Sequence, residues 1–194
     1  MSGAESGLLA FFAALAAQRT SELALSARGA KRLRARGARE YGSGHFPLLV
    51  GLHVLFPLAL AAEFLWLHAR PWASWPAWLA LLLGAQALRF WSMRALGERW
   101  TVRILVVPGE PLVRGGPYRF LRHPAYVAVA LELLAAPLLF GAWRTALVIG
   151  ALNAIALGIR IRAEEAALRE AGASSAGPAA RQPGIPMSRA PSEE

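Results

Sequence analysis

Four long apolar stretches constrain what this chain can fold into more than any other feature of its sequence. They run over residues 46–69, 72–88, 125–143 and 145–159. A helix needs about 20 mostly apolar residues to cross the hydrocarbon core of a bilayer. A weaker stretch over residues 7–25 is interpreted as a first span, with Arg19 and Glu22 on an inward face. The sequence therefore predicts an all-α integral membrane protein of about five transmembrane helices.

The short break at residues 141–144 leaves room only for a tight turn, so the last two spans are expected to form a C-terminal helical hairpin. Residues 1–170 are predicted to form one membrane domain. Residues 171–194 contain small side chains and four prolines, and such a segment buries too little apolar surface to order itself. We expect it to be a disordered C-terminal tail.

Of the 21 basic residues, 20 are Arg, and 18 of the 21 gather in three segments: residues 28–39, residues 89–122 and the chain from 160 onward. Cytoplasmic segments of membrane proteins collect Lys and Arg. This pattern predicts that both long loops and the C-terminus face the cytoplasm and that the N-terminus lies outside. A nucleic-acid-binding stripe would also give the net charge of +9, but the alternation with apolar spans argues against nucleic acid and favours membrane lipids as partners.

Several classes of functional site are excluded because the chain lacks the residues that they require. The chain has no Cys and no Asp, which excludes thiolate chemistry, Cys-ligated metals and a Ser-His-Asp triad. The four His show no i, i+4 pairing, so no metal site is predicted. No phosphate-binding loop and no GxGxxG fingerprint occur, so a Rossmann-type cofactor domain is not expected.

The segment between residues 96 and 126 is more elaborate than a simple connection requires. Residues 101–107 are β-branched and apolar, which indicates a short extended piece. Pro124 suits the first position of a helix, which places His123 near its cap beside Arg122. Such a helix start favours a carboxylate or phosphate. The alternative is that Arg122 and His123 only mark the membrane interface.

A second polar pattern lies in the last span. Asn153, Arg160 and Glu164 are seven and four residues apart and share one helix face, whereas Arg162 and Glu165 are expected to point elsewhere. Ordinary surface Arg–Glu contacts are the alternative. Together with the helix start, this face could hold a small zwitterion, with its carboxylate at the helix start and its amine at Glu164.

Two further acids, Glu63 and Glu132, lie inside predicted spans. Ionisable groups at such positions usually face the bundle interior and often carry function. Pairing with a structural Arg is the other interpretation.

These residues resemble the isoprenylcysteine carboxyl methyltransferase family. The match lies in Leu112-Val113-x-x-Gly116-x-Tyr118-x-x-x-Arg122-His123-Pro124-x-Tyr126 and in Arg160-x-x-x-Glu164-Glu165-x-x-Leu168. The resemblance covers about residues 96–170. It implies a small membrane enzyme that binds S-adenosyl-L-methionine at its cytoplasmic face without a Rossmann fold.

The resemblance also implies site residues. By position in the family motif, Arg160 faces the acceptor and is the candidate catalytic residue. Arg122 and Asn153 join the candidates for cofactor binding from the geometry above, and Arg103 is an approximate match. The predicted cofactor-binding residues are Leu112, Val113, Tyr118, Arg122, His123, Pro124, Tyr126, Asn153 and Glu164. The chain departs from the family at Val127-Ala128, where glycine is common.

One bacterial subgroup is more similar still, through Leu96-Gly97-x-x-Trp100-Thr101-x-Arg103-Ile104 and Asn153-Ala154-x-x-Leu157-x-x-Arg160-Ile161. Its members are associated with type III polyketide synthases and O-methylate long-chain alkylpyrones or alkylresorcinols. The abundance of Arg and Ala with little Lys indicates a GC-rich bacterium, hence an inner-membrane location and a polyketide-lipid acceptor. Carboxyl methylation of isoprenylcysteine, N-methylation of a lipid amine, a small transporter and a membrane scaffold remain alternatives.

Overall fold

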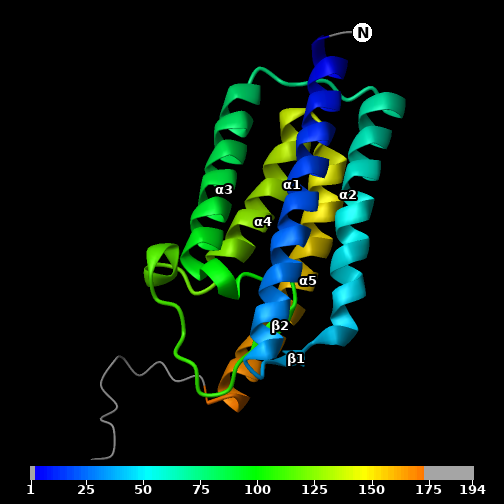
Figure 1. Ribbon diagram of the computed structural model, residues 1–194. Helices are drawn as coiled ribbons and strands as arrows, with labels where there is room; N and C mark the ends of the chain where they lie inside the picture. Colours follow the sequence, from blue (N-terminus) through cyan, green and yellow to red (C-terminus); the bar gives the residue numbers. More distant parts are fainter. Residues whose placement is uncertain (1–2, 173–194) are drawn as a thin grey trace, which may run out of the picture.

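The computed structural model describes residues 3–172, which form a bundle of five helices with a small strand pair at one end (Figure 1). The helices are α1 (Gly3–Ala35), α2 (Phe46–Trp66), α3 (Trp75–Leu96), α4 (Pro124–Leu139) and α5 (Trp143–Glu170). In Figure 1 the N-terminal end of α1 and the two short connections lie at the top of the bundle. The α1–α2 connection, the long α3–α4 loop and the end of α5 lie at the bottom.

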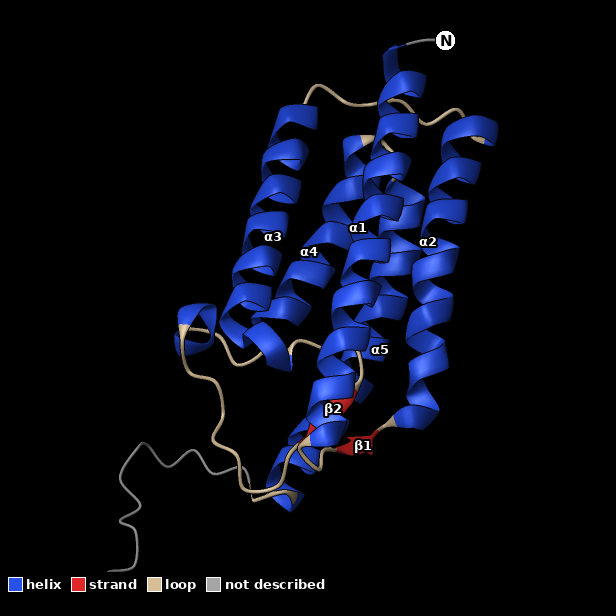
Figure 2. Ribbon diagram, in the orientation of Figure 1, coloured by secondary structure: helices blue, strands red, loops and turns tan. Residues whose placement is uncertain are grey.

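The bottom of the bundle also carries the shorter elements. Strands β1 (Arg39–Tyr41) and β2 (Ile104–Val106) pair in antiparallel register (Figure 2). The 3-10 helices are η1 (Ser43–His45), η2 (Gly97–Arg99) and η3 (Gly116–Arg119). The extended piece predicted within residues 101–107 is therefore confirmed, and its partner strand comes from the α1–α2 connection.

Within residues 3–172, three helical segments are long and apolar enough to cross a membrane: Gly3–Ala35, Ser43–Trp66 and Trp143–Glu170. Helix α4 is apolar but shorter. The chain is thus a mostly helical membrane protein, and the five-span arrangement stays a prediction. Both end helices are longer than the apolar pattern indicated, since α1 continues to Ala35 and α5 to Glu170. The predicted tail lies outside the described residues from position 173 onward.

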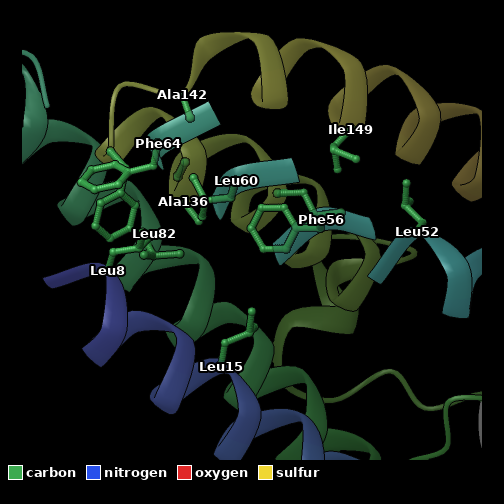
Figure 3. Close-up of a cluster of buried hydrophobic side chains, with 13 residues drawn as sticks. Leu8, Leu15, Leu52, Phe56, Leu60, Phe64, Leu82, Ala136, Ala142 and Ile149 are labelled. Carbon is green, nitrogen blue, oxygen red and sulfur yellow. The ribbon is translucent and has the colours of Figure 1, made fainter. Parts of the chain in front are cut away.

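An apolar core joins all five helices. Figure 3 shows side chains of this core pointing toward one another, among them Leu8, Phe56, Leu82 and Ile149. The outward faces are also apolar, because Leu58, Leu83, Leu147 and Ile155 are each at least 60% exposed. Exposed apolar surface on this scale suits contact with lipid rather than water.

The predicted hairpin between α4 and α5 is confirmed. Its turn depends on Gly141, whose φ of 74° lies in the left-handed region that favours glycine. A side chain at this position would also collide with the backbone carbonyl of Arg70 from the α2–α3 connection. The Ala142 N–H donates to the Pro137 carbonyl at 2.8 Å and closes the turn.

Glu63 fastens the start of α5 to the end of α2. Its carboxylate accepts hydrogen bonds from the backbone N–H groups of Arg144 (3.1 Å) and Thr145 (2.6 Å). The first N–H groups of a helix have no partner within the helix, so this carboxylate satisfies two of them. Glu63 therefore has a structural role: it fixes the position of α5 along the axis of α2.

Glu132 belongs to a buried ion cluster of two arginines and two glutamates. Arg89 of α3 donates to Glu132 of α4 and, at 3.1 Å, to both carboxylate oxygens of Glu22 on α1. Arg19 of α1 donates to Glu22 at 2.9 Å and to Glu132 at 2.7 Å. Glu22 and Glu132 are thus both paired with Arg, and the inward face predicted for Arg19 and Glu22 is confirmed.

Replacement of the capping carboxylate, Glu63→Ala, is expected to lower the free energy of unfolding by about 1–3 kcal/mol, because two backbone N–H groups at the start of α5 lose their acceptor. Chemical unfolding in detergent measures this change. Glu98→Ala is the matched control, since the Glu98 side chain is 67% exposed and pairs with Arg32 on the surface. Equal stability of the two variants would contradict the capping role.

Candidate functional site

A cavity of about 640 Å³ lies where the α3–α4 loop folds against the end of α5. We call it the loop cavity. Its wall carries six arginines and three glutamates beside apolar side chains. Eight of the ten predicted site residues line it: Leu112, Val113, Tyr118, Arg122, His123, Tyr126, Arg160 and Glu164. The loop cavity therefore gathers most of the residues that the sequence motif singled out.

The other two predicted residues lie elsewhere. Pro124 is fully buried at the first position of α4 and lines neither cavity described here. Asn153 lies deeper in the bundle, two helical turns before Arg160, and does not reach the loop cavity. The structure thus separates Asn153 from the predicted cofactor-binding set.

A second cavity of about 390 Å³ lies between the helices, and we call it the bundle cavity. Much of its wall is apolar. Leu23 of α1 and Val50 and Val54 of α2 line it and are themselves 47–57% exposed at the outer surface of the bundle. The bundle cavity therefore opens sideways between α1 and α2, on a surface that suits lipid.

The two cavities share one wall. The residues that line both are Leu96, Thr101, Tyr118, His123, Tyr126, Arg160 and Glu164. A molecule in the loop cavity and another in the bundle cavity would consequently meet across the same few polar side chains.

Tyr126 is the centre of this shared wall. Its hydroxyl donates to the Glu164 carboxylate and accepts a hydrogen bond from Arg160 Nε at 2.8 Å. Its ring stacks on the His123 imidazole, with ring centroids 5.4 Å apart and planes 13° from parallel. The predicted common face of Arg160 and Glu164 is confirmed, and Tyr126 from α4 links the two.

Arg160 is buried and oriented from two sides. Besides its bond to Tyr126, it donates through one terminal nitrogen to the Val102 carbonyl at 2.6 Å. Within the described part of the chain, its other terminal nitrogen makes no hydrogen bond. A held guanidinium with one free N–H edge can bind an oxygen anion in the cavity.

The prediction that Glu165 points away from the site was wrong. Glu165 lines the loop cavity. It forms an ion pair with Arg122, with 3.3 Å from its carboxylate to Nη1, and it lies 3.4 Å from His123 Nε2. The start of α4 packs beside α5, so that two adjacent faces of α5 border the same space. Arg162 is exposed, as predicted.

The backbone at the start of α4 offers less to an anion than the sequence indicated. Pro124 has no N–H, and the N–H groups of Tyr126 and Val127 already donate to the His123 carbonyl at 3.1 and 3.2 Å. Arginine side chains supply the positive charge instead. Arg99 lines the loop cavity and carried no motif signal, whereas Arg119 belongs to the Gly116-Pro117-Tyr118-Arg119 part of the subgroup motif and Arg103 was an approximate match.

A strand cover, formed by β1, β2 and residues 107–114, closes one side of the loop cavity. Ile104 and Val106 pack on Ala167 and Ala171 near the end of α5. The Gly109 N–H donates to the Ala171 carbonyl at 3.0 Å. These contacts attach the cover to the same helix that carries Arg160 and Glu164.

Ion pairs fasten the strand cover to α1 and to the α3–α4 loop. Glu40 accepts hydrogen bonds from Arg103 and, at 2.8 Å, from Arg34. Glu110 pairs with Arg36 and, at 3.2 Å, with Arg99. Because Arg99, Arg103 and Glu110 also line the loop cavity, the position of the cover and the charge of the cavity wall depend on the same groups.

Tyr118 brings a neutral hydroxyl to the shared wall. Burial and the nearby Glu164 carboxylate raise the pKa of this phenol well above its ordinary value. Both effects disfavour the phenolate. The Tyr118 hydroxyl is therefore neutral at physiological pH and can donate a hydrogen bond.

Comparison with known proteins places the candidate site within a family domain. The model of the isoprenylcysteine carboxyl methyltransferase (ICMT) family matches residues 78–170, which hold the shared wall and most of both cavities. Residues 78–170 therefore carry an ICMT family domain. The chain is 40% identical over 158 residues to the uncharacterized protein YpbQ of Bacillus subtilis (strain 168), and these residues cover 81% of this chain and 94% of that protein.

A second relative is an uncharacterized protein of Haemophilus influenzae (strain ATCC 51907 / DSM 11121 / KW20 / Rd). It is 34% identical over 158 residues, which cover 81% of this chain and 92% of the relative. No solved structure matches the chain. The ICMT family domain implies a methyltransferase, and the apolar helices agree with a membrane protein.

The strand cover is expected to loosen at acidic pH. Arg103 and Arg34 beside Glu40 lower the pKa of its carboxylate in the folded protein. These contacts therefore stabilise the cover fully above the unfolded pKa of about 4.3, and this contribution is lost as pH falls through the lower folded pKa. Hydrogen exchange of residues 39–41 and 104–106, measured from pH 7 to pH 3, should show faster opening at the acidic end. In the Glu40→Gln variant this pH dependence should be weaker than in the wild type, because only the Glu110 pairs remain, and an unchanged dependence would contradict the assignment.

Proposed function

We propose that this protein is an S-adenosyl-L-methionine-dependent O-methyltransferase that acts on an amphipathic, lipid-like acceptor at the cytoplasmic face of a bacterial inner membrane. One observation carries the proposal: a charged cavity at the loop end and a lipid-accessible cavity in the bundle share a wall built from Tyr126, Arg160 and Glu164. A cofactor and an acceptor on the two sides of that wall would meet there.

The loop cavity fits the chemistry of S-adenosyl-L-methionine. Its volume of about 640 Å³ lies within the usual range for sites that enclose a small molecule. Arginines on its wall can bind the carboxylate of the amino-acid part, and Glu164 and Glu165 can bind positive charge. Leu112, Val113 and Leu168 offer apolar contacts to a flat ring. When bound, this cofactor supplies a methyl group activated by its positively charged sulfur.

The protein's own residues would act on the acceptor. The free terminal nitrogen of Arg160 can bind the acceptor oxygen, and its positive charge favours the ionised form of that oxygen at neutral pH. Tyr126 and the Val102 carbonyl hold the guanidinium in place. The enzyme then needs alignment and exclusion of water more than a strong base.

The side opening between α1 and α2 suits an acceptor whose alkyl tail stays in the bilayer. We propose the hydroxyl of an alkylpyrone or alkylresorcinol as the methylated group, made by a type III polyketide synthase. The support is the subgroup motif around Trp100 and Asn153 together with a cavity that takes a lipid-like molecule. The Arg160 cation on the shared wall favours an anionic oxygen over the ammonium of a lipid amine.

The role of Glu164 can be tested on the cofactor alone. Glu164→Gln removes the charge that faces the loop cavity and is expected to weaken binding of S-adenosylhomocysteine by about tenfold or more. Calorimetry on the detergent-purified protein measures the affinity. Glu98→Gln removes an exposed carboxylate outside both cavities and serves as the control. Absence of binding by the folded wild-type protein in lipid nanodiscs would refute the methyltransferase proposal.

The role of Arg160 can be tested through the pH dependence of methyl transfer. Arg160→Gln is expected to lower the rate of methylation of a 5-alkylresorcinol by about 10²-fold at pH 7, because the ionised oxygen loses its counter-charge. The deficit should shrink as pH rises toward the pKa of the free phenol, where the acceptor ionises without help. A mass increase of one methyl group reports the product. A deficit that stays constant with pH would contradict this role.

A further inference from the structure

The inner end of the bundle cavity is polar, which an alkyl chain does not require. Five polar side chains from four helices line it: Arg19 and Glu22 of α1, His53 of α2, Arg89 of α3 and Asn153 of α5. Polar groups at such depth in an apolar bundle are costly unless they pair or bind something. We call this set the polar floor.

The residues of the polar floor lie at a common level. Glu63 of α2 bonds to the start of α5 at Arg144 and Thr145, and the two helices run in opposite directions. His53 precedes Glu63 by ten residues, and Asn153 follows Arg144 by nine, so the two face the cavity at about the same depth. Arg160 lies two helical turns from Asn153, roughly 10 Å along the axis.

Several polar atoms of the floor lack a partner. Asn153 is 2% exposed, and its carbonyl oxygen has no hydrogen bond within residues 3–172. His53 Nδ1 contacts the Leu49 carbonyl at 2.8 Å, so Nδ1 carries the proton and Nε2 is an acceptor. A buried unpaired amide is destabilising by about 1–3 kcal/mol, which favours a ligand at this place.

The charges of the floor are balanced. Arg19 and Arg89 are paired with Glu22 and Glu132, two positive groups against two negative groups. A charged ligand group would disturb this balance at bilayer depth. The floor therefore suits a neutral group that donates and accepts hydrogen bonds.

Building on the proposed function, we propose that Asn153 and His53 determine acceptor specificity by binding a second, neutral oxygen of the acceptor head group. The head group would carry one oxygen at Arg160 and another at the polar floor. Asn153 and Arg160 are two helical turns apart on α5, a span that a ring with oxygens on two sides and a hydrogen bond at each end can cover. The alkyl tail would leave between α1 and α2, past Leu23 and Val54.

Two probes that differ by one hydroxyl test this proposal: a 5-alkylresorcinol and a 3-alkylphenol of equal chain length. Their binding is measured by calorimetry on the full-length protein loaded with S-adenosylhomocysteine, in detergent. The wild-type protein is expected to bind the resorcinol about tenfold or more tightly than the phenol. Asn153→Leu should remove this preference by weakening the resorcinol only. His53→Leu, on the opposite wall, should reduce the same preference and supplies an independent variant if Asn153→Leu does not fold.

Leu157→Ala is the matched control, because Leu157 lies one turn from Asn153, lines the bundle cavity and has no polar group. It should weaken both probes alike. Equal binding of the two probes by the wild type, or failure to bind either, would overturn the polar-floor proposal. So would an equal loss of both probes in the Asn153→Leu variant. Methyl transfer is scored separately, so a protein that binds with the expected preference but transfers no methyl group would contradict the proposed function alone.

Discussion

The buried ion cluster of Arg19, Glu22, Arg89 and Glu132 is the interaction on which the bundle depends. It joins α1 to α3 and α4 in the apolar interior, where a charge without a partner is severely destabilising. Removal of one member of such a cluster typically costs about 3–5 kcal/mol, because the remaining charge stays buried. Arg19, Glu22 and Arg89 of this cluster also line the bundle cavity. The cluster therefore closes the inner end of that cavity as well as holding α1 in the bundle.

Helix α5 carries most of the candidate chemistry, and its position is determined at both ends. Glu63 bonds to its first N–H groups at the top of the bundle, and the strand cover packs on Ala167 and Ala171 at the bottom. Between these attachments, Tyr126 connects Arg160 to Glu164. Because the loop cavity and the bundle cavity meet at this wall, we expect changes in Tyr126 to affect cofactor and acceptor together.

Local motifs predicted the loop cavity well, because its residues are close in sequence or share one helix face. Leu112 to Tyr126 are one segment, and the spacing of Arg160 and Glu164 follows from helix geometry. The surroundings of Glu165 and Asn153 depend instead on which neighbouring helix packs against each face of α5. Periodicity gives the direction of a side chain around its own helix and no information on the neighbouring helix. Only the packing of α4 beside α5 brings Glu165 to His123 and leaves Asn153 in another cavity.

The sequence by itself determined the mostly helical membrane character, the hairpin at Gly141 and the set of polar residues at the loop end, because length, apolarity and spacing are local properties of the chain. The tertiary structure decided which buried charges pair, where the two cavities lie and which polar atoms remain free. Glu132 and Asn153 are similar by sequence, since each is a polar residue inside an apolar run. Only one of them meets arginines, because ion pairing depends on the distance between helices that are far apart in the chain.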